Sequence, residues 1–377
     1  MHDAPRSVNP EKITAMFEKI LNGQIDKLPK KQKQFASYIR DRKIMQWGGL
    51  ADEFDEFERR YGITLELLKY FDRIDYPLSF STKSHWFTED SRYMELFRRH
   101  SHNWHVKISI ITDDDTQSRR MEKGCPPSSE RLKTIKALSD MGIHVTLRLR
   151  PYIIGLSESF PALISRAHEA GADSVTTEFF CMESRADENL QARYAEMSRI
   201  IGFDIYEFYR KHSVQSGYKR LNRQIKRPII ARMRDCAHEL GMRFHVSDMY
   251  CREYNDAMNC CGVPPEWSVS YGGHFGNAIL IAREKGRVSF SDIAEDAKSY
   301  LSGFLYSDAH GFNQSSSRNR AKYACCSMSD YVRRCWNDVK KATSPARGYG
   351  GILVPDGKDS DGNIMYRYRS EERLPDE

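Results

Sequence analysis

Three apolar strands that each end in polar residues constrain the fold of this chain more than any other feature. They end in Ser81-Thr82-Lys83-Ser84, in Ser109-Ile110-Ile111-Thr112 and in Arg148-Leu149-Arg150-Pro151. In a parallel β/α barrel the C-terminal ends of the strands build the active site, whereas the opposite edge mainly serves stability. The pattern therefore predicts that polar groups from three strands meet at one edge of a parallel sheet.

Strands and helices alternate along the first two thirds of the chain. Strands are expected near residues 43–47, 77–82, 105–111, 143–149, 173–178 and 242–246. The helix expected at 129–141 is the clearest, because its apolar residues recur at helical spacing and Gly142 stands where a left-handed terminator is expected. This alternation predicts an α/β fold, namely a partial parallel β/α (TIM-like) barrel.

The alternation of strands and helices ends after residue 250. We expect residues 1–250 to form the barrel domain and residues 251–377 to form an irregular, cysteine-rich C-terminal extension. Within that extension, the apolar runs at 352–354 and 364–366 surround an Asp/Gly-rich turn and predict a β-hairpin.

Charge, cysteine content and hydropathy limit the classes of protein to which this chain could belong. The balance of 58 Lys+Arg against 52 Asp+Glu permits an anionic partner without arguing for one. The nine cysteines are scattered and odd in number, so reduced thiols are expected rather than a disulfide framework. The chain contains no run of roughly 18 apolar residues and starts with no apolar signal core, which predicts a soluble cytoplasmic protein with no membrane partner.

Several residues at the strand ends could bind a ligand. Gly48 and Gly49 would let the backbone approach an amino-acid moiety closely, although the pair is also an ordinary tight turn. Lys83 could direct its ammonium at a carboxylate or lie at the surface, and Ser109 needs a partner that a ligand or a backbone carbonyl could supply. Arg148 and Arg150 share one strand face, which is unusual unless they meet anions or carboxylates.

Together, these segments resemble the radical S-adenosylmethionine (SAM) superfamily, and within it the spore photoproduct lyase-like branch of DNA repair photolyase type. The resemblance covers roughly residues 43–180. The matching elements, in order, are Gly48-Gly49 with Asp52 and Glu58, Ser81-Thr82-Lys83-Ser84, Lys107-Ile108-Ser109-Ile110, Glu122 with Pro126-Pro127 and Arg131-Leu132, and the run from Arg148 to Gly155.

The resemblance implies a cofactor and a reaction. Family members hold a [4Fe–4S] cluster on a Cys-x-x-x-Cys-x-x-Cys loop, bind SAM at the unique iron and cleave it reductively to a 5′-deoxyadenosyl radical. By position, Gly48 and Gly49 look like contacts to the methionyl end of SAM, and Lys83 and Ser109 look like polar contacts. The segment from Arg148 through Pro151 to Ile153 looks like the edge near the adenine.

No Cys-x-x-x-Cys-x-x-Cys occurs in this sequence, and no cysteine precedes Cys125. We expect the first strand and its cluster loop to be missing through a late start, a truncation or a split gene. A natural family member that has lost its cluster is the alternative.

The later cysteines allow further roles. Cys181 and Cys251 follow strands and could donate a hydrogen atom to a substrate radical, although each could equally be a buried spectator. Two groups of cysteines could hold an auxiliary cluster or zinc, namely Cys251, Cys260 and Cys261, and Cys325, Cys326 and Cys335. Neither group has the short pair-plus-pair spacing of a strong metal signature.

Three functions follow from these observations. The first is a radical SAM enzyme that takes electrons from a donor such as flavodoxin or ferredoxin and acts on a substrate that could be nucleic acid. The second is a degenerate, non-catalytic barrel that binds SAM or nucleic acid. The third is a metal-binding barrel that uses the C-terminal cysteines.

Overall fold

A computed structural model describes most of the chain, and its compact parts form two units. The described residues are 8–33, 35–49, 51–183, 187–213, 219–267, 275–294, 328–340, 344–349 and 351–369. The first unit comprises residues 1–8, 44–256 and 260–267, and the second comprises residues 9–43, 257–259 and 268–377. This grouping differs from the predicted division at residue 250 mainly because residues 9–43 belong with the second unit.

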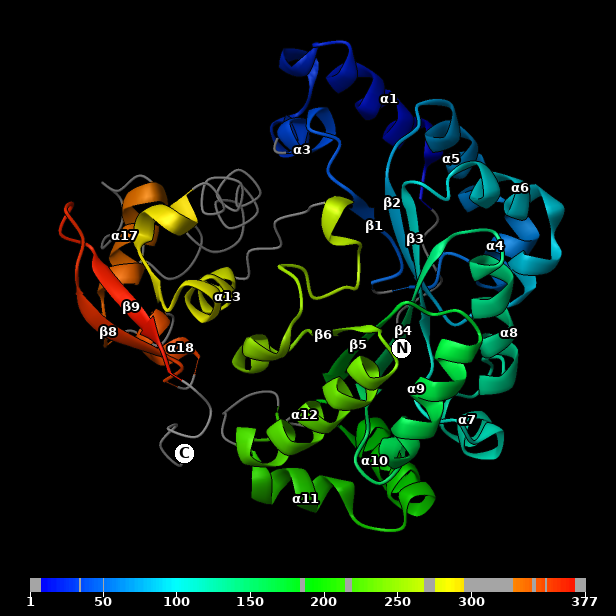
Figure 1. Cartoon of the computed structure of the whole chain (residues 1–377). Coiled ribbons are helices and arrows are strands. Elements are labelled where there is room, and N and C mark those ends of the chain that lie inside the picture. The colour runs from blue at the N-terminus through cyan, green and yellow to red at the C-terminus, as the bar shows by residue number, and fades with distance from the viewer. Residues whose placement is uncertain are drawn as a thin grey trace. The chain divides into compact units, whose positions relative to one another are not determined.

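The first unit contains a six-stranded parallel sheet (Figure 1). Its strands lie side by side in chain order: β1 (Met45–Gln46), β2 (Leu78–Thr82), β3 (Trp104–Ser109), β4 (His144–Tyr152), β5 (Ser174–Phe179) and β6 (Arg243–Val246). Every neighbouring pair is parallel, and within the described residues β1 and β6 do not pair. The predicted α/β class and the partial, unclosed parallel β/α barrel are therefore confirmed.

Helices connect the strands of the first unit. They are α4 (Glu56–Tyr61), α5 (Ile63–Arg73), α6 (Ser91–Arg99), α7 (Asp115–Met121), α8 (Ser128–Ser139), α9 (Phe160–Glu169), α10 (Glu188–Ile201), α11 (Ile205–His212) and α12 (Arg223–Glu239). Short 3-10 turns are η2 (Trp86–Glu89), η3 (Ser157–Ser159), η4 (Met249–Tyr254) and η5 (Pro265–Trp267). Gly142 terminates the turn after α8 with a φ of 82°, as its position in the sequence predicts.

The two faces of the sheet differ in chemistry. Side chains alternate along a strand, and the parallel register places like parities beside one another. One parity is mostly apolar and buried; for example, Phe80 and Trp104 pack edge-on against Phe97 of α6. The other parity forms a polar face, whose members are Gln46, Ser79, Ser81, His105, Lys107, Ser109, Thr146, Arg148, Arg150, Ser174, Thr176, Glu178 and His245.

The second unit has its own core. Its elements are α1 (Pro10–Leu21), η1 (Ile25–Lys27), α2 (Lys30–Lys33), α3 (Ala36–Arg40), α13 (Gly276–Lys285), β7 (Arg287–Val288), α17 (Met328–Asn337), α18 (Pro345–Gly348), β8 (Leu353–Lys358) and β9 (Ile364–Tyr368). The strands β8 and β9 pair antiparallel, so the predicted hairpin is present, and β7 adds to its other edge. Trp336 and Tyr366 are fully buried in the core of this unit.

Among the helices in the described part of the chain, none is both long and apolar enough to cross a lipid bilayer.

Asp52 fixes the loop after β1 to the end of β2. Its Oδ1 accepts hydrogen bonds from the Thr82 hydroxyl at 2.7 Å and from the Phe54 backbone at 3.0 Å, and its Oδ2 accepts one from the Lys83 backbone at 2.7 Å. One carboxylate therefore satisfies three donors from two segments that are about thirty residues apart. The position of the C-terminal edge of β2 depends on this contact.

We expect Asp52→Ala to lower the free energy of unfolding by roughly 2 kcal/mol, because it leaves partly buried donors without an acceptor. Chemical denaturation would measure the loss. The matched control is Asp55→Ala, which removes only the exposed N-cap of α4 and should cost about 1 kcal/mol. A loss for Asp52→Ala no larger than that of the control would contradict the assigned role.

Candidate functional site

The C-terminal ends of β1 and β2 approach each other closely at Gly48. The φ of Gly48 is 77°, and a Cβ atom at this position would collide with the carbonyl oxygen of Ser81 and the carboxylate of Glu53. Only glycine fits both the left-handed backbone and the close approach. Gly49 is exposed, and a Cβ atom there would meet open space. Of the two predicted glycines, only Gly48 is therefore required by the surrounding structure.

Lys83 belongs to a network of ion pairs. Its ammonium lies 2.8 Å from Glu122 Oε1, and the other oxygen of Glu122 accepts a hydrogen bond from Arg131 at 2.6 Å. Arg131 is fully buried and also donates to the Ser109 carbonyl at 2.8 Å. Lys83 thus helps to fix Glu122 and, through Arg131, the end of β3. Its charge is already paired with a protein carboxylate.

Two cations lie on the polar face, of which Lys107 is buried and Arg148 is partly buried. Lys107 donates to Ser79 Oγ at 2.8 Å and to Gln46 Oε1 at 3.2 Å, and Arg148 donates to Ser109 Oγ at 2.9 Å. All of these acceptors are neutral, and neither cation forms an ion pair among the described residues. Burial lowers the pKa of Lys107, while burial and the neighbouring charge of Arg150 lower the pKa of Arg148 to about 10. The geometry leaves positive charge here that an anion would stabilise.

A directional chain of hydrogen bonds extends from Lys107 across the sheet. Its successive links join Lys107 to Ser79, Ser79 to His105 Nδ1 at 2.9 Å, His105 Nε2 to Thr146 at 2.7 Å, Thr146 to Ser174 at 2.6 Å and Ser174 to Asp173 at 3.0 Å. Lys107 can only donate and a carboxylate can only accept, so one orientation lets every link donate once. In that orientation His105 is neutral, in agreement with its pKa, which burial and the Lys107 charge lower.

Glu53 supplies a buried carboxyl group beside these cations. Its Oε1 accepts from the Ser81 backbone at 3.3 Å, whereas its Oε2 is buried without a hydrogen-bond partner in the described structure. Burial and the negative charge of Asp52 raise the pKa of Glu53 to about 8. Unsatisfied buried polar atoms of this kind mark a place that a polar ligand could fill.

A pair of adjacent thiols lies over the polar face. The Cys260 carbonyl accepts from Thr176 at 2.7 Å, and a Cβ atom on Gly262 would collide with Thr146, so this segment fits tightly against β4 and β5. The Sγ atoms of Cys260 and Cys261 are 3.7 Å apart. The hydrogen bond from Cys260 and the charges of Lys107 and Arg150 lower the pKa of Cys261, although burial opposes the shift. This face therefore attracts negative charge.

The other predicted residues lie nearby at the same edge or next to it. Pro151 continues β4, and both backbone groups of Ile153 are engaged in local turns, its N–H by Ser157 Oγ at 3.2 Å and its carbonyl by the next turn. Cys181 lines a pocket of about 190 Å³ at the ends of β5 and β6, together with Glu178, Lys226 and Asp248 among others. Cys251 is fully buried in η4, and burial raises its pKa.

The described cysteines do not form a cluster site. Among the described residues, Cys251 is not part of a close group with Cys260 and Cys261, and no three thiols converge. Cys325 and Cys326 lie outside the described residues. A [4Fe–4S] cluster that binds SAM needs three thiolates, so the residues that the structure describes do not fit one.

Lys107 and Glu53 belong to the site but were not predicted as site residues from the sequence. Lys107 alternates with Val106 and Ile108, which is the signal that it shares a strand face with Ser109. Glu53 lies in a densely acidic stretch that resembles a solvated loop, and no local pattern distinguishes it from exposed neighbours such as Asp55 and Glu56.

The stretch at 206–227 interleaves tyrosines with basic residues, a composition suited to nucleic acid. Among its described residues, 206–213 and 219–227, several are engaged within the protein. Arg223 and Lys226 are buried and paired with Glu253 and Asp248. The Tyr209 hydroxyl donates to the Phe180 carbonyl at 2.7 Å, whereas Lys219 lies over the Tyr206 ring at 5.0 Å. The charges of Arg223 and Lys226 are therefore neutralised internally.

Comparisons with known proteins found distant structural likenesses. No family model matches the sequence, and no curated protein matches it. Two solved structures of spore photoproduct lyase, a cysteine-to-serine mutant and a tyrosine-to-phenylalanine mutant, match with 15% identity and a TM-score of 0.45. A double mutant with bound AdoMet and dinucleoside spore photoproduct matches with 14% identity and a TM-score of 0.43. Each likeness covers 63% of this chain and 66% of the lyase chain, and the distance is too great to transfer the role of any residue.

The raised pKa of Glu53 predicts a pH-dependent stability. The pKa is higher in the folded chain than the ordinary value of 4.5, so the stabilising contribution of Glu53 is complete below about pH 4.5 and is lost as the pH rises to about 8. Glutamine does not ionise, so Glu53→Gln removes this pH-dependent loss of stability. We expect the variant to gain on the order of 3 kcal/mol over the parent protein between about pH 5 and about pH 8. Denaturation at both pH values would measure it.

The matched control is Glu95→Gln on the exposed surface of α6, which should show no comparable pH-dependent gain. Parallel stability profiles for Glu53→Gln and the parent would contradict the raised pKa.

Proposed function

We propose that this chain binds S-adenosylmethionine at the C-terminal edge of the parallel sheet and holds its methionyl end between Glu53 and the two cations Lys107 and Arg148. One observation carries the proposal. The buried Lys107 and the partly buried Arg148 form no ion pair among the described residues, and they share a polar face with a buried carboxyl oxygen that has no hydrogen-bond partner there.

The methionyl end of SAM has the complementary charges. It carries an α-carboxylate, which suits Lys107 and Arg148, and an α-ammonium, which suits the Glu53 carboxylate. Binding a cation would favour the ionised form of Glu53 and so offset the effect of its burial. The three side chains are close enough for their charges to affect one another, because each of the two cations interacts electrostatically with Glu53. A zwitterion could therefore contact all three groups.

Several predicted contacts are compatible with this site. Gly48 provides the close approach of β1 and β2 beside Glu53, and Ser109 and Arg148 are hydrogen-bonded to each other at the end of β3. Contacts of Gly49, Pro151 and Ile153 with the cofactor stay predictions. Lys83 acts in our proposal by fixing Glu122 rather than by binding the ligand directly. The ordered motifs that resemble the radical SAM superfamily add support from the sequence.

Radical chemistry would need groups that the described residues do not supply. Reductive cleavage of SAM, the [4Fe–4S] cluster and an electron donor such as flavodoxin or ferredoxin stay predictions for a complete form of the protein. The hydrogen-atom donor roles of Cys181 and Cys251 depend on that chemistry and stay predictions as well. The binding of SAM rests on residues of this chain alone.

A nucleic-acid substrate is a separate prediction. Its basis is reduced to a few side chains, such as the Lys219–Tyr206 contact, because Arg223 and Lys226 are paired internally. The observed geometry favours a small zwitterionic ligand over an extended polyanion, since Lys107 is buried and Arg148 is partly buried on one sheet face, and the two cations are not spread over a surface.

Titration calorimetry with SAM tests the proposal on the full chain. We expect binding to the parent protein and a loss of about tenfold or more for Glu53→Gln and for Arg148→Met, since each removes a charge-assisted hydrogen bond. Free methionine should compete with SAM, and adenosine should compete less. Lys133→Met, which removes an exposed cation of α8, is the matched control and should bind as the parent does.

Two results would overturn the assignment. Absence of SAM binding to the parent protein would reject the function. Binding that survives both site substitutions, or that adenosine alone reproduces, would show that the methionyl end is not what the polar face recognises.

A further inference from the structure

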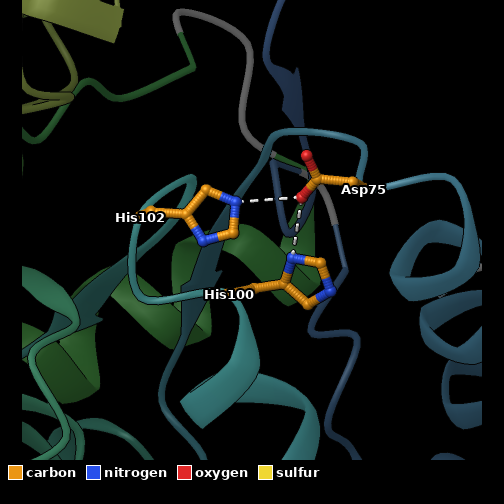
Figure 2. Close-up of side chains that lie close together, drawn as sticks. All are labelled: Asp75, His100 and His102. Carbon is orange, nitrogen blue, oxygen red and sulfur yellow. Dashed lines mark hydrogen bonds and ion pairs between the residues drawn. The ribbon is translucent and has the colours of Figure 1, made fainter.

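A second group of ligating side chains lies at the opposite, N-terminal edge of the sheet. Asp75 lies in the loop before β2, and His100 and His102 lie in the loop before β3. Figure 2 shows both imidazole rings directed at one oxygen of the Asp75 carboxylate. The distance from Asp75 Oδ1 is 2.9 Å to His102 Nε2 and 3.4 Å to His100 Nδ1. Two loops that are about 25 residues apart in the sequence therefore converge on one point.

The contacts of His100 fix the orientation of its ring. His100 Nε2 lies 2.8 Å from Asp72 Oδ1, and Asp72 is held in turn by Arg99 through two hydrogen bonds. A carboxylate accepts only, so the neutral ring carries its proton on Nε2. The lone pair of Nδ1 then faces oxygen atoms, since Asn103 Oδ1 lies 3.1 Å away and Asp75 Oδ1 lies beyond it.

The orientation of the Asn103 amide is fixed independently. Its Nδ2 donates to Asp75 Oδ1 at 2.8 Å and to the Asp75 carbonyl at 3.2 Å, so its oxygen must be the atom that faces His100. A neutral His100 with its proton on Nε2 thus directs the Nδ1 lone pair toward the oxygen atoms of Asn103 and Asp75. Together with His102 Nε2, this nitrogen and the Asp75 oxygen are the kinds of ligand atom that a cation binds.

We propose that Asp75, His100 and His102 bind a divalent transition metal ion, with zinc as the best fit. Zinc accepts imidazole nitrogen and carboxylate oxygen at roughly 2.0 to 2.2 Å, and four-coordinate sites often leave one position for water. The ligand atoms of the three residues lie within 4.8 Å of one another. Ligand atoms around such an ion are spaced by about 3.3 Å, which follows from those bond lengths and a tetrahedral angle, so only small shifts are needed.

Asp72 provides the outer contact that metal-bound histidines usually have. Ligating imidazoles commonly donate their second N–H to a carboxylate, which fixes the ring and increases its basicity. The His100 ring is also fixed by stacking on Trp104, with ring centroids 4.4 Å apart. His102 and Asp75 remain exposed, so an ion can enter from solvent. The bound ion would join the α5–β2 loop to the α6–β3 loop.

Calorimetry with Zn²⁺ and absorption spectroscopy with Co²⁺ test the proposal on the full, chelator-treated chain. We expect Zn²⁺ to bind and to raise the melting temperature, because it binds the folded state. Co²⁺ should give visible d–d bands of a nitrogen and oxygen site without a thiolate charge-transfer band. Asp72→Asn should weaken binding by about tenfold to a hundredfold, and His102→Gln should weaken it further.

The control is His238→Gln, a variant that loses an exposed histidine–aspartate pair, 2.8 Å long, elsewhere in the first unit. This variant should bind Zn²⁺ as the parent does. His102 is exposed, so its substitution should leave the fold intact, and circular dichroism would confirm this. The proposal fails if the parent binds no Zn²⁺, if His102→Gln retains the parent's affinity, or if Co²⁺ shows only a thiolate-ligated spectrum.

Discussion

The alternation of apolar and polar side chains along six parallel strands is the constraint on which the first unit depends. One parity supplies the apolar face, which the helices cover, and it includes Phe80, Trp104 and Leu147. The side chains of the other parity are polar and largely buried. A buried polar group is tolerated only where it has a hydrogen-bond partner. The chain from Lys107 through His105 to Asp173 meets this requirement across four strands.

The places where that requirement is not met are informative. A polar face could be satisfied entirely by neutral side chains, yet this one holds Lys107 and Arg148 on neutral acceptors and leaves an oxygen of Glu53 unpartnered within the described residues. Desolvation of these charges destabilises the folded chain, as the lowered pKa values of the cations and the raised pKa of Glu53 indicate. Groups retained at such a cost are typical of binding sites.

The sequence predicts the fold well where the signal is local. The strand positions, the antiparallel hairpin and the terminator at Gly142 all depend on short-range periodicity or on a single residue type, and the structure confirms them. The polar interior was not predicted, because a mixed run such as that around Lys107 does not say which parity the helices cover. The grouping of residues 9–43 with the second unit was not predicted either, because no local pattern in the sequence encodes it.

The candidate site shows the same division between local and non-local signals. Ser109 and Arg148 could be found because polar residues at period two are conspicuous in an apolar strand. The ion pair of Lys83 could not be predicted from the sequence, because its partner Glu122 lies in a loop 39 residues further along the chain that folds back toward it. The same pairing explains why a lysine at a strand end need not bind ligand. Arg131 is fully buried beneath Glu122, so one carboxylate stabilises two cations, and loss of either partner would leave buried charge uncompensated. Lys83 therefore serves the polar face indirectly, by keeping Arg131 on the Ser109 carbonyl and the end of β3 in place.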